Sequence, residues 1–135
     1  MRTAARECVL KYLYAERIND ECGGQLFESL LKDDKLKEED RAFARSLLAA
    51  VEENKEQLLN EIASLSVGFQ LERMFEIDKC ALLIGMAEIA FFQDIPFVVS
   101  VNEAVNLVSK YSTEKSMGFV NGILAEFGRR RGLNS

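Results

Sequence analysis

Apolar residues recur at helical spacing along almost the whole 135-residue chain. Within residues 3–17, the apolar positions 5, 9, 12 and 13 repeat with the i, i+4, i+7, i+8 spacing of one helix face. Residues 38–64 show the same kind of spacing through Phe43, Leu47, Val51, Leu58 and Ile62. These patterns predict two amphipathic helices, and we expect a shorter helix over residues 25–32 between them.

A second pattern, apolar nearly all round, marks residues 79–92, KCALLIGMAEIAFF. Such a segment is typical of a helix enclosed by its neighbours, so we expect it to be the central helix of the fold. Asp78 stands at its beginning, where a short acidic side chain can cap a helix. Pro96 follows its end and holds the preceding residue extended, which predicts a turn.

Ser100 and Glu103 have the spacing of a capping box, in which both side chains bond to backbone amides at the start of a helix. We therefore expect a helix over residues 100–111, followed by a last helix that begins at residue 114 or 116 and ends at residue 130. Gly122 interrupts the last helix and is interpreted as a position of close packing against a neighbour. Altogether the sequence predicts an all-α fold of about seven helices in one compact domain, residues 1–135.

The net charge of −5 disfavours nucleic acid as a partner, but the charge is unevenly distributed. Residues 1–15 carry a net charge of +2, residues 16–78 carry −8, and residues 79–135 carry +1. An acidic middle between two mildly basic ends is compatible with a local basic patch if the ends meet in space. Ordinary solvated charged faces are the simpler alternative.

Catalysis and metal binding have little support in the sequence. The chain has no histidine, no pair of clustered cysteines, and no GxSxG, P-loop or dinucleotide-binding motif, so we expect no catalytic residue, no metal site and no cofactor. Glu88 is the one carboxylate inside the apolar central segment, and it is interpreted as a hydrogen-bond acceptor that joins two helices. The three cysteines form no CxxC pair and are expected to be reduced, two of them in the core, as in a cytoplasmic protein. No apolar run is long enough for a membrane span.

The remaining polar and aromatic candidates indicate a binding protein, and each has a structural alternative. Two arginines one turn apart share a helix face that can attract phosphate groups, although solvated surface arginines are equally expected. Two aromatic residues could stack on unpaired bases, although aromatic residues at helical spacing more often belong to the core. Two lysines flank the loop between the last two helices and could add phosphate contacts. These six RNA-binding candidates are Arg2, Arg6, Tyr14, Lys110, Lys115 and Phe119.

Several motifs, taken in order, resemble the NusB family of bacterial transcription antitermination factors. The most specific pair is N-E-A-V at residues 102–105 and F-V-N-G-I-L at residues 119–124. Residues 5–14, ARECVLKYLY, are similar to the family's first helix, and residues 77–89, IDKCALLIGMAEI, to its central helix. The DIPF stretch at residues 94–97 resembles the family's D-V-P turn. The resemblance covers essentially the whole chain, with order and spacing preserved.

The resemblance implies an all-helical fold of two packed helical halves and a non-catalytic role in ribosomal RNA transcription. Family members bind the boxA segment of nascent RNA together with NusE, a ribosomal protein of the small subunit, in an antitermination complex with RNA polymerase. On this basis the NusE-binding side would include the beginning of the central helix, with Glu76 and Asp78. The RNA contacts carried onto matching positions are Arg2, Arg6, Tyr14 and Phe119. Arg6→Ala is accordingly expected to weaken RNA binding and its salt dependence.

Three departures from the family pattern keep two alternatives open. The family usually has an arginine and a tyrosine in the central helix and a basic residue before F-V-N-G, where this chain has Leu83, Ala87 and Gly118. The first alternative is a divergent protein-binding member with weak or no RNA binding, since counterion release requires cations. The second is a stand-alone relative of the N-terminal domain of certain RNA cytosine methyltransferases, although the F-V-N-G-I-L motif fits the free-standing family better. The oligomeric state is open, a homodimer over the RNA surface included.

Overall fold

The computed structural model describes residues 2–19, 21, 23–33, 35–66 and 71–133. Within these ranges the chain forms six α-helices and one 3₁₀ turn, without a strand. The helices are α1 (Arg2–Ile18), α2 (Gly24–Leu30), α3 (Glu38–Leu65), α4 (Glu76–Phe91), α5 (Phe97–Tyr111) and α6 (Glu114–Arg130), and the 3₁₀ turn is Leu71–Arg73. The predicted all-α class is confirmed. The described residues contain six helices rather than the predicted number of about seven.

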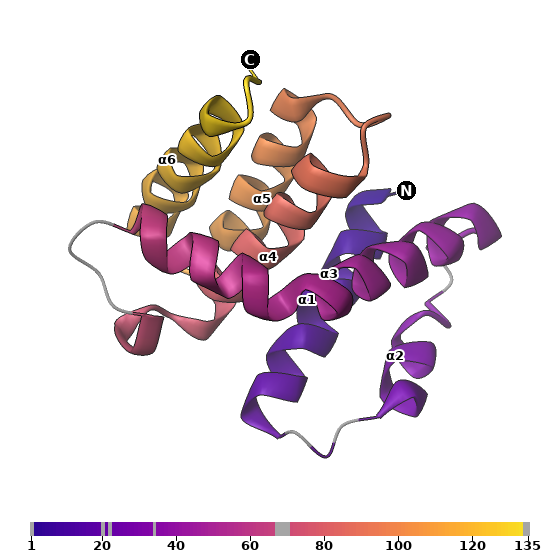
Figure 1. Cartoon of the computed structure of the whole chain (residues 1–135). Helices are drawn as coiled ribbons and strands as arrows, with labels where there is room; N and C mark the ends of the chain where they lie inside the picture. The colour runs from indigo at the N-terminus through magenta and orange to yellow at the C-terminus, as the bar shows by residue number, and fades with distance from the viewer. Residues whose placement is uncertain (1, 20, 22, 34, 67–70, 134–135) are drawn as a thin grey trace.

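The helices form two packed halves, as predicted (Figure 1). In one half, α4, α5 and α6 lie side by side, and each of them contacts the other two. In the other half, α1 contacts both α2 and α3. The long helix α3 crosses the molecule and also contacts α4, while α1 contacts α4 as well. The two halves are therefore joined around α4.

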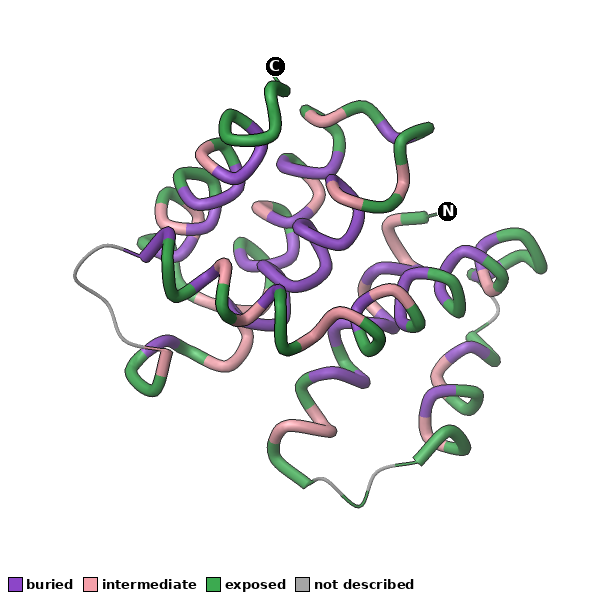
Figure 2. Tube along the Cα trace, viewed as in Figure 1, coloured by how far each residue is buried: buried purple, intermediate pink, exposed green. Residues whose placement is uncertain are grey.

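Helix α4 is the centre of the fold. Every residue from Asp78 to Ile89 is buried, and α4 contacts α1, α3, α5 and α6 (Figure 2). A helix that is covered on all sides must be apolar on all sides, because a buried polar group without a partner is unfavourable. The pattern of residues 79–92 thus predicted the central position of this helix correctly.

The beginning of α5 differs from the prediction. The helix starts at Phe97 with Pro96 as its N-cap, so Ser100 lies inside it and the predicted capping box is wrong. The Ser100 hydroxyl instead donates to Glu88 on α4 at 3.0 Å, and Glu103 accepts hydrogen bonds from α1. Both side chains have the spacing of a cap, but they form hydrogen bonds with residues on other helices instead.

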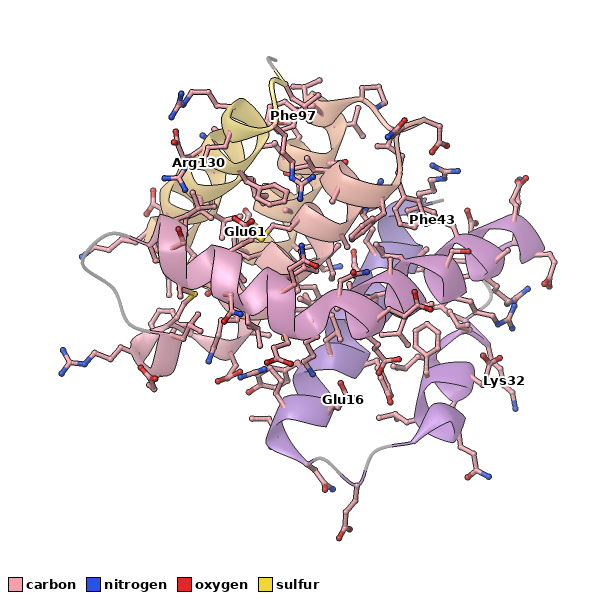
Figure 3. All side chains as sticks on the ribbon, viewed as in Figure 1. Glu16, Lys32, Phe43, Glu61, Phe97 and Arg130 are labelled. Atoms are coloured by element: carbon pink, nitrogen blue, oxygen red, sulfur yellow. The ribbon has the colours of Figure 1, made fainter. Side chains whose placement is uncertain are left out.

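The close-packed glycines also differ from the prediction. Gly122 is exposed, and a β-carbon placed on it would have no neighbour within 4 Å, so its interpretation as a packing position is wrong. The tight positions are Gly85 on α4 and Gly128 on α6. A β-carbon on Gly85 would lie 2.7 Å from Leu124 Cδ1, and one on Gly128 would collide with the ring of Phe97, which is labelled in Figure 3.

Two buried cysteines confirm the prediction that two of the three belong to the core. Cys8 and Cys80 are both free and buried, while Cys22 lies outside the described residues. Burial raises the pKa of the Cys80 thiol to about 12 and raises that of Cys8 above its usual value. Neither thiol is therefore poised as a nucleophile. In the part of the chain that the structure describes, no helix combines the length and apolarity of a membrane crossing.

Candidate nucleic-acid interface

Arg6 is buried in a network of hydrogen bonds instead of facing solvent. Only 3% of it is exposed. Its Nε and Nη2 donate to the two carboxylate oxygens of Glu88 at 2.6 and 2.8 Å, and its Nη1 donates to Glu103 at 2.7 Å. Ser100 donates a further hydrogen bond to Glu88, and Thr3 donates one to Glu103. Because the guanidinium is enclosed by these partners, the interpretation of Arg6 as an exposed cation for phosphate groups is wrong.

The network gives Arg6 and Glu88 a structural role that joins α1 to α4 and α5. Burial alone would lower the pKa of the Arg6 guanidinium, but its hydrogen bonds to Glu88 and the charges of Glu88 and Glu103 outweigh burial and raise the pKa above its usual value. Glu88 accepts from Arg6 on α1 and from Ser100 on α5. Its interpretation as an acceptor that joins helices is confirmed.

Arg2 is the cation of the predicted pair that remains at the surface. Its side chain is 49% exposed, and its Nη1 lies 3.9 Å from a carboxylate oxygen of Asp94, at the limit of an ion pair. Its guanidinium lies 4.4 Å from the centre of the Phe43 ring. This stacking holds the charge at the edge of a shallow hollow of about 370 Å³ beside the turn that contains Pro96. Arg2 therefore keeps its positive charge at the surface, next to the carboxylate of Asp94.

Lys110 and Tyr14 lie on the outer surfaces of α5 and α1. Lys110 is exposed, but its Nζ lies 3.0 Å from Glu7, which also accepts a hydrogen bond from the Tyr111 hydroxyl at 2.7 Å. Burial alone would raise the pKa of Glu7, but these two hydrogen bonds outweigh it and hold the pKa below its usual value. The positive charge of Lys110 is thus offset locally, whereas Tyr14 presents an exposed aromatic ring.

Lys115 and Phe119 border a hollow between the beginnings of α4 and α6, which we call the α4–α6 hollow. It has a volume of about 590 Å³. Its walls are mostly apolar, and its lining includes Arg73, Met74, Phe75, Asp78, Lys115 and Phe119. Lys115 and Arg73 are exposed, whereas Phe119 is half-buried. Two of the six predicted RNA-binding residues therefore lie together here, four residues apart on α6, and the packing of α6 against α4 adds the rest of the lining.

The two predicted protein-partner residues have different environments. Glu76 is half-buried and forms ion pairs with Arg17 and Lys79, whose hydrogen bonds lower its pKa against the opposing effect of burial. Asp78 lies in the first turn of α4 and not at its cap, is only 4% exposed, and accepts a hydrogen bond from the Ser116 hydroxyl at 2.7 Å. Only Glu76 thus presents its carboxylate toward the surface.

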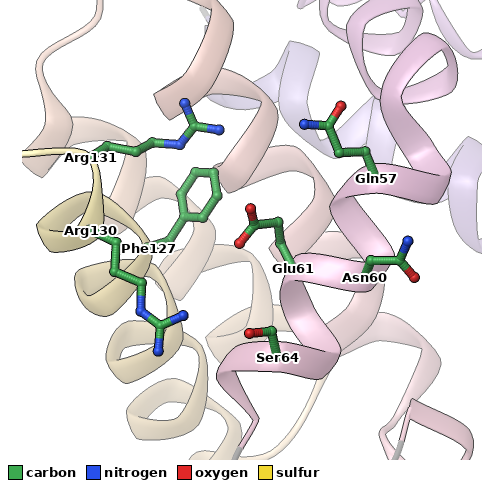
Figure 4. Close-up of a pocket in the computed structure, with 7 residues that line it drawn as sticks. All are labelled: Gln57, Asn60, Glu61, Ser64, Phe127, Arg130 and Arg131. Carbon is green, nitrogen blue, oxygen red and sulfur yellow. The ribbon is translucent and has the colours of Figure 1, made fainter.

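A polar groove between α3 and α6 was not expected from the sequence (Figure 4). It has a volume of about 460 Å³ and is lined by Gln57, Asn60, Glu61 and Ser64 from α3, by Phe127 and Arg130 from α6, and by Arg131, the C-cap of α6. Arg130 forms an ion pair with Glu126, and the Arg131 guanidinium lies 4.5 Å from the centre of the Phe127 ring. Arg129 also forms an ion pair with Glu126, so all three arginines near the end of the chain have partners on α6. No periodicity in the sequence indicates that these two helices meet.

The two basic ends of the chain approach the turn between α4 and α5. Arg2 and Pro96 line one hollow at this turn, and Arg131 and Pro96 line another. The ends therefore come near the same turn, but they border separate hollows. In the described ranges, no three side chains of the metal-binding types histidine, cysteine, aspartate and glutamate come together.

Comparison with known proteins supports the family resemblance over nearly the full chain. The sequence model of the NusB family matches residues 3–129. The transcription antitermination protein NusB of Ruminiclostridium cellulolyticum is 38% identical over 128 residues, covering 95% of this chain and 88% of that protein. The protein of the same name from Methylacidiphilum infernorum is 36% identical over 127 residues, covering 91% of this chain and 87% of that one.

Solved structures of NusB proteins also resemble this chain in fold. The structure of T. maritima NusB is similar with a TM-score of 0.88 and 28% sequence identity, covering 96% of this chain and 91% of that one. A chain in the crystal structure of the antitermination factors NusB and NusE in complex with double-stranded RNA has a TM-score of 0.85 and 25% identity, with 96% of each chain covered. The chain therefore belongs to the NusB family of non-catalytic transcription antitermination factors.

Proposed function

We propose that this chain binds boxA-type RNA together with NusE, and so takes part in the antitermination complex of RNA polymerase during ribosomal RNA transcription in the cytoplasm. The observation that carries the proposal is the similarity, over 96% of this chain, to a structure that contains NusB, NusE and RNA. Residues 1–135 would act as one RNA- and protein-binding domain. The function is binding, and no step of chemical catalysis is involved.

The RNA-binding residues of this proposal are those that the structure leaves accessible. Arg2 and Lys115 supply exposed positive charge, and Tyr14 and Phe119 supply aromatic faces for unpaired bases. Lys110 contributes less, because Glu7 offsets its charge. Arg6 acts indirectly: its network holds α1 against α4 and α5 and thereby positions Arg2 one turn away.

The protein-binding side of the proposal lies at the beginning of α4. Glu76 is half-buried there, next to Phe75, a large apolar side chain that is 58% exposed. An exposed aromatic ring beside a carboxylate suits a basic, partly apolar partner surface. Holding RNA and NusE on one small protein would raise the effective concentration of each near the other.

A titration of labelled boxA RNA tests the proposed function. We expect the chain to bind boxA RNA more tightly than a scrambled RNA of the same composition, and the addition of NusE to tighten binding further. Fluorescence anisotropy at fixed salt would measure both affinities. Capture of NusE without any RNA binding would contradict the proposal and favour a divergent protein-binding member.

Arg2→Ala is expected to weaken boxA binding and to lower the slope of log affinity against log salt by about 1, because one phosphate contact is lost. The matched control is Arg129→Ala, which removes another exposed arginine whose partner is Glu126 on its own helix. Anisotropy titrations at several salt concentrations would measure both variants. Equal slopes for Arg2→Ala and the unaltered protein would contradict the phosphate contact.

A further inference from the structure

We propose that Phe43 on α3 is a positioning residue for RNA binding, because its ring restrains the Arg2 guanidinium before a phosphate group arrives. This inference rests on the proposed RNA-binding function and deepens it, since it assigns part of the affinity to a core residue that acts through Arg2. The arguments are the stacking of Arg2 on the ring, the contacts that fix the ring itself, and the weak pairing of Arg2 with Asp94.

The ring of Phe43 lies beneath the Arg2 guanidinium. The guanidinium carbon is 4.4 Å from the centre of the ring, and at such a distance a cation is attracted by the negative face of an aromatic ring. Phe43 is only 7% exposed, whereas the Arg2 side chain is 49% exposed. The ring therefore forms a buried floor beneath a cation that solvent and ligands can reach.

The ring of Phe43 is itself held by contacts that do not involve Arg2. The guanidinium of Arg6 lies 5.2 Å from the same ring centre, and Arg6 is fixed in turn by two hydrogen bonds to Glu88. The ring of Phe92, the C-cap of α4, packs edge-on against Phe43 with the two ring centres 5.6 Å apart and the planes at 74°. The core therefore sets the orientation of this ring, and the ring restrains Arg2.

A restrained arginine binds a phosphate group at a smaller cost in entropy. A freely moving arginine side chain loses rotamers when it is immobilised in an interface, which weakens binding by about two- to tenfold for each such side chain. Because Arg2 is already stacked on Phe43, part of this ordering takes place when the protein folds. The RNA then meets a cation whose position is set in advance.

The charge of Arg2 stays available although an acid is near. Arg2 Nη1 lies 3.9 Å from a carboxylate oxygen of Asp94, whose side chain is 71% exposed, so water and salt screen this pair. Lys110 also lies over a ring, with its Nζ 5.3 Å from the centre of Tyr111, but that Nζ is only 3.0 Å from Glu7. Of these two ring-held cations, Arg2 is the one that can better attract a phosphate group.

Phe43→Leu tests the inference, because leucine remains apolar but has no aromatic face. We expect the variant to bind boxA RNA about two- to tenfold more weakly than the unaltered protein, as measured by fluorescence anisotropy at fixed salt. In the Arg2→Ala background the same substitution should change the affinity by less than about twofold, since the arginine through which Phe43 acts is absent. The matched control is Phe27→Leu, which removes a ring of similar burial that packs against Tyr12 and should leave the affinity unchanged.

Fluorinated phenylalanines at position 43 separate positioning from packing. Ring fluorines withdraw electrons from the aromatic face and weaken its attraction for a cation, while the shape of the side chain is nearly kept. The affinity for boxA RNA should therefore fall stepwise with one, two and three fluorines, by about two- to fivefold at the end of the series. A purely structural role of the ring would not follow this order, and the series remains informative if Phe43→Leu disturbs folding.

A measurement without RNA completes the test. The NMR order parameter of the Arg2 Nε–H group in the free protein should fall in Phe43→Leu and stay unchanged in Phe27→Leu. An unchanged order parameter, additive effects of Phe43→Leu and Arg2→Ala on affinity, or equal affinities across the fluorinated series would each overturn the inference. Absence of boxA binding by the unaltered protein would instead refute the proposed RNA-binding function, and with it any role of Phe43 in that function.

Discussion

Arg6→Ala is expected to lower the free energy of unfolding by about 3–5 kcal/mol, the cost of removing one partner from a buried ion pair. The reason is that Glu88, 1% exposed, would keep its charge without the guanidinium that donates to both of its oxygens. Glu103 is 18% exposed and can turn toward water, so most of the loss comes from Glu88. Urea unfolding followed by circular dichroism would measure the difference.

The matched control for Arg6 is Arg2→Ala, on the same helix and one turn earlier. Because the Arg2 side chain is 49% exposed, we expect a change in stability of no more than about 0.5 kcal/mol. The double variant Arg6→Met with Glu88→Leu should recover most of the stability lost in Arg6→Ala, since apolar residues of similar volume can replace a buried ion pair. If Arg6→Ala were as stable as Arg2→Ala, the buried network would not contribute as described.

Leu124→Ala is expected to lower the free energy of unfolding by about 2–5 kcal/mol, because it removes a fully buried side chain between α6 and α4. Gly85→Ala alone is expected to destabilise the fold, since its new β-carbon would lie 2.7 Å from Leu124 Cδ1 and 3.3 Å from the β-carbon of Ala104. In the Leu124→Ala background the same change should stabilise the fold, because the methyl group enters the space that leucine leaves. Urea unfolding of the unaltered protein, the two single variants and the double variant measures the coupling energy between the two substitutions. We expect this energy to be about 1–3 kcal/mol.

Gly122→Ala is the control for this cycle. This glycine also lies inside a helix, but a β-carbon there would have no neighbour within 4 Å. We expect a gain of about 0.5–1 kcal/mol from helix propensity alone. Additive effects of Gly85→Ala and Leu124→Ala would contradict the close packing of α4 against α6.

The helices that sequence periodicity predicted well are those whose ends depend on local chemistry. The predicted range 38–64 is α3 within one residue at its end, and the predicted last helix matches α6, where the Thr113 hydroxyl accepts the Ser116 amide as a side-chain cap. The start of α5 was placed three residues late because Ser100 and Glu103 had the spacing of a cap. Their real partners, Glu88 and Arg6, lie on other helices, and spacing within one segment carries no information about such partners.

The candidate site was predictable only in part, because spacing along one helix shows which side chains share a face but not which of them become buried. Arg2 and Lys115 are exposed as expected, since charged side chains on the outer face of a helix stay in water. Tyr14 is exposed too, although an aromatic residue at helical spacing more often belongs to the core. Arg6 was expected there too, because a spacing of four residues places two side chains on one face. A face that lies along the border between core and solvent can hold one exposed arginine and one buried arginine, as this one does.

The sequence by itself determined the helical class, the central position of α4 and the family, because each depends on periodicity and motif order along the chain. Only the tertiary structure decided which polar residues are structural and which can bind. Residues 6 and 88 form an ion pair, and residues 78 and 116 share a hydrogen bond beside a hollow. Which donors meet which acceptors depends on how helices distant in sequence pack together, and burial then makes the paired groups structural.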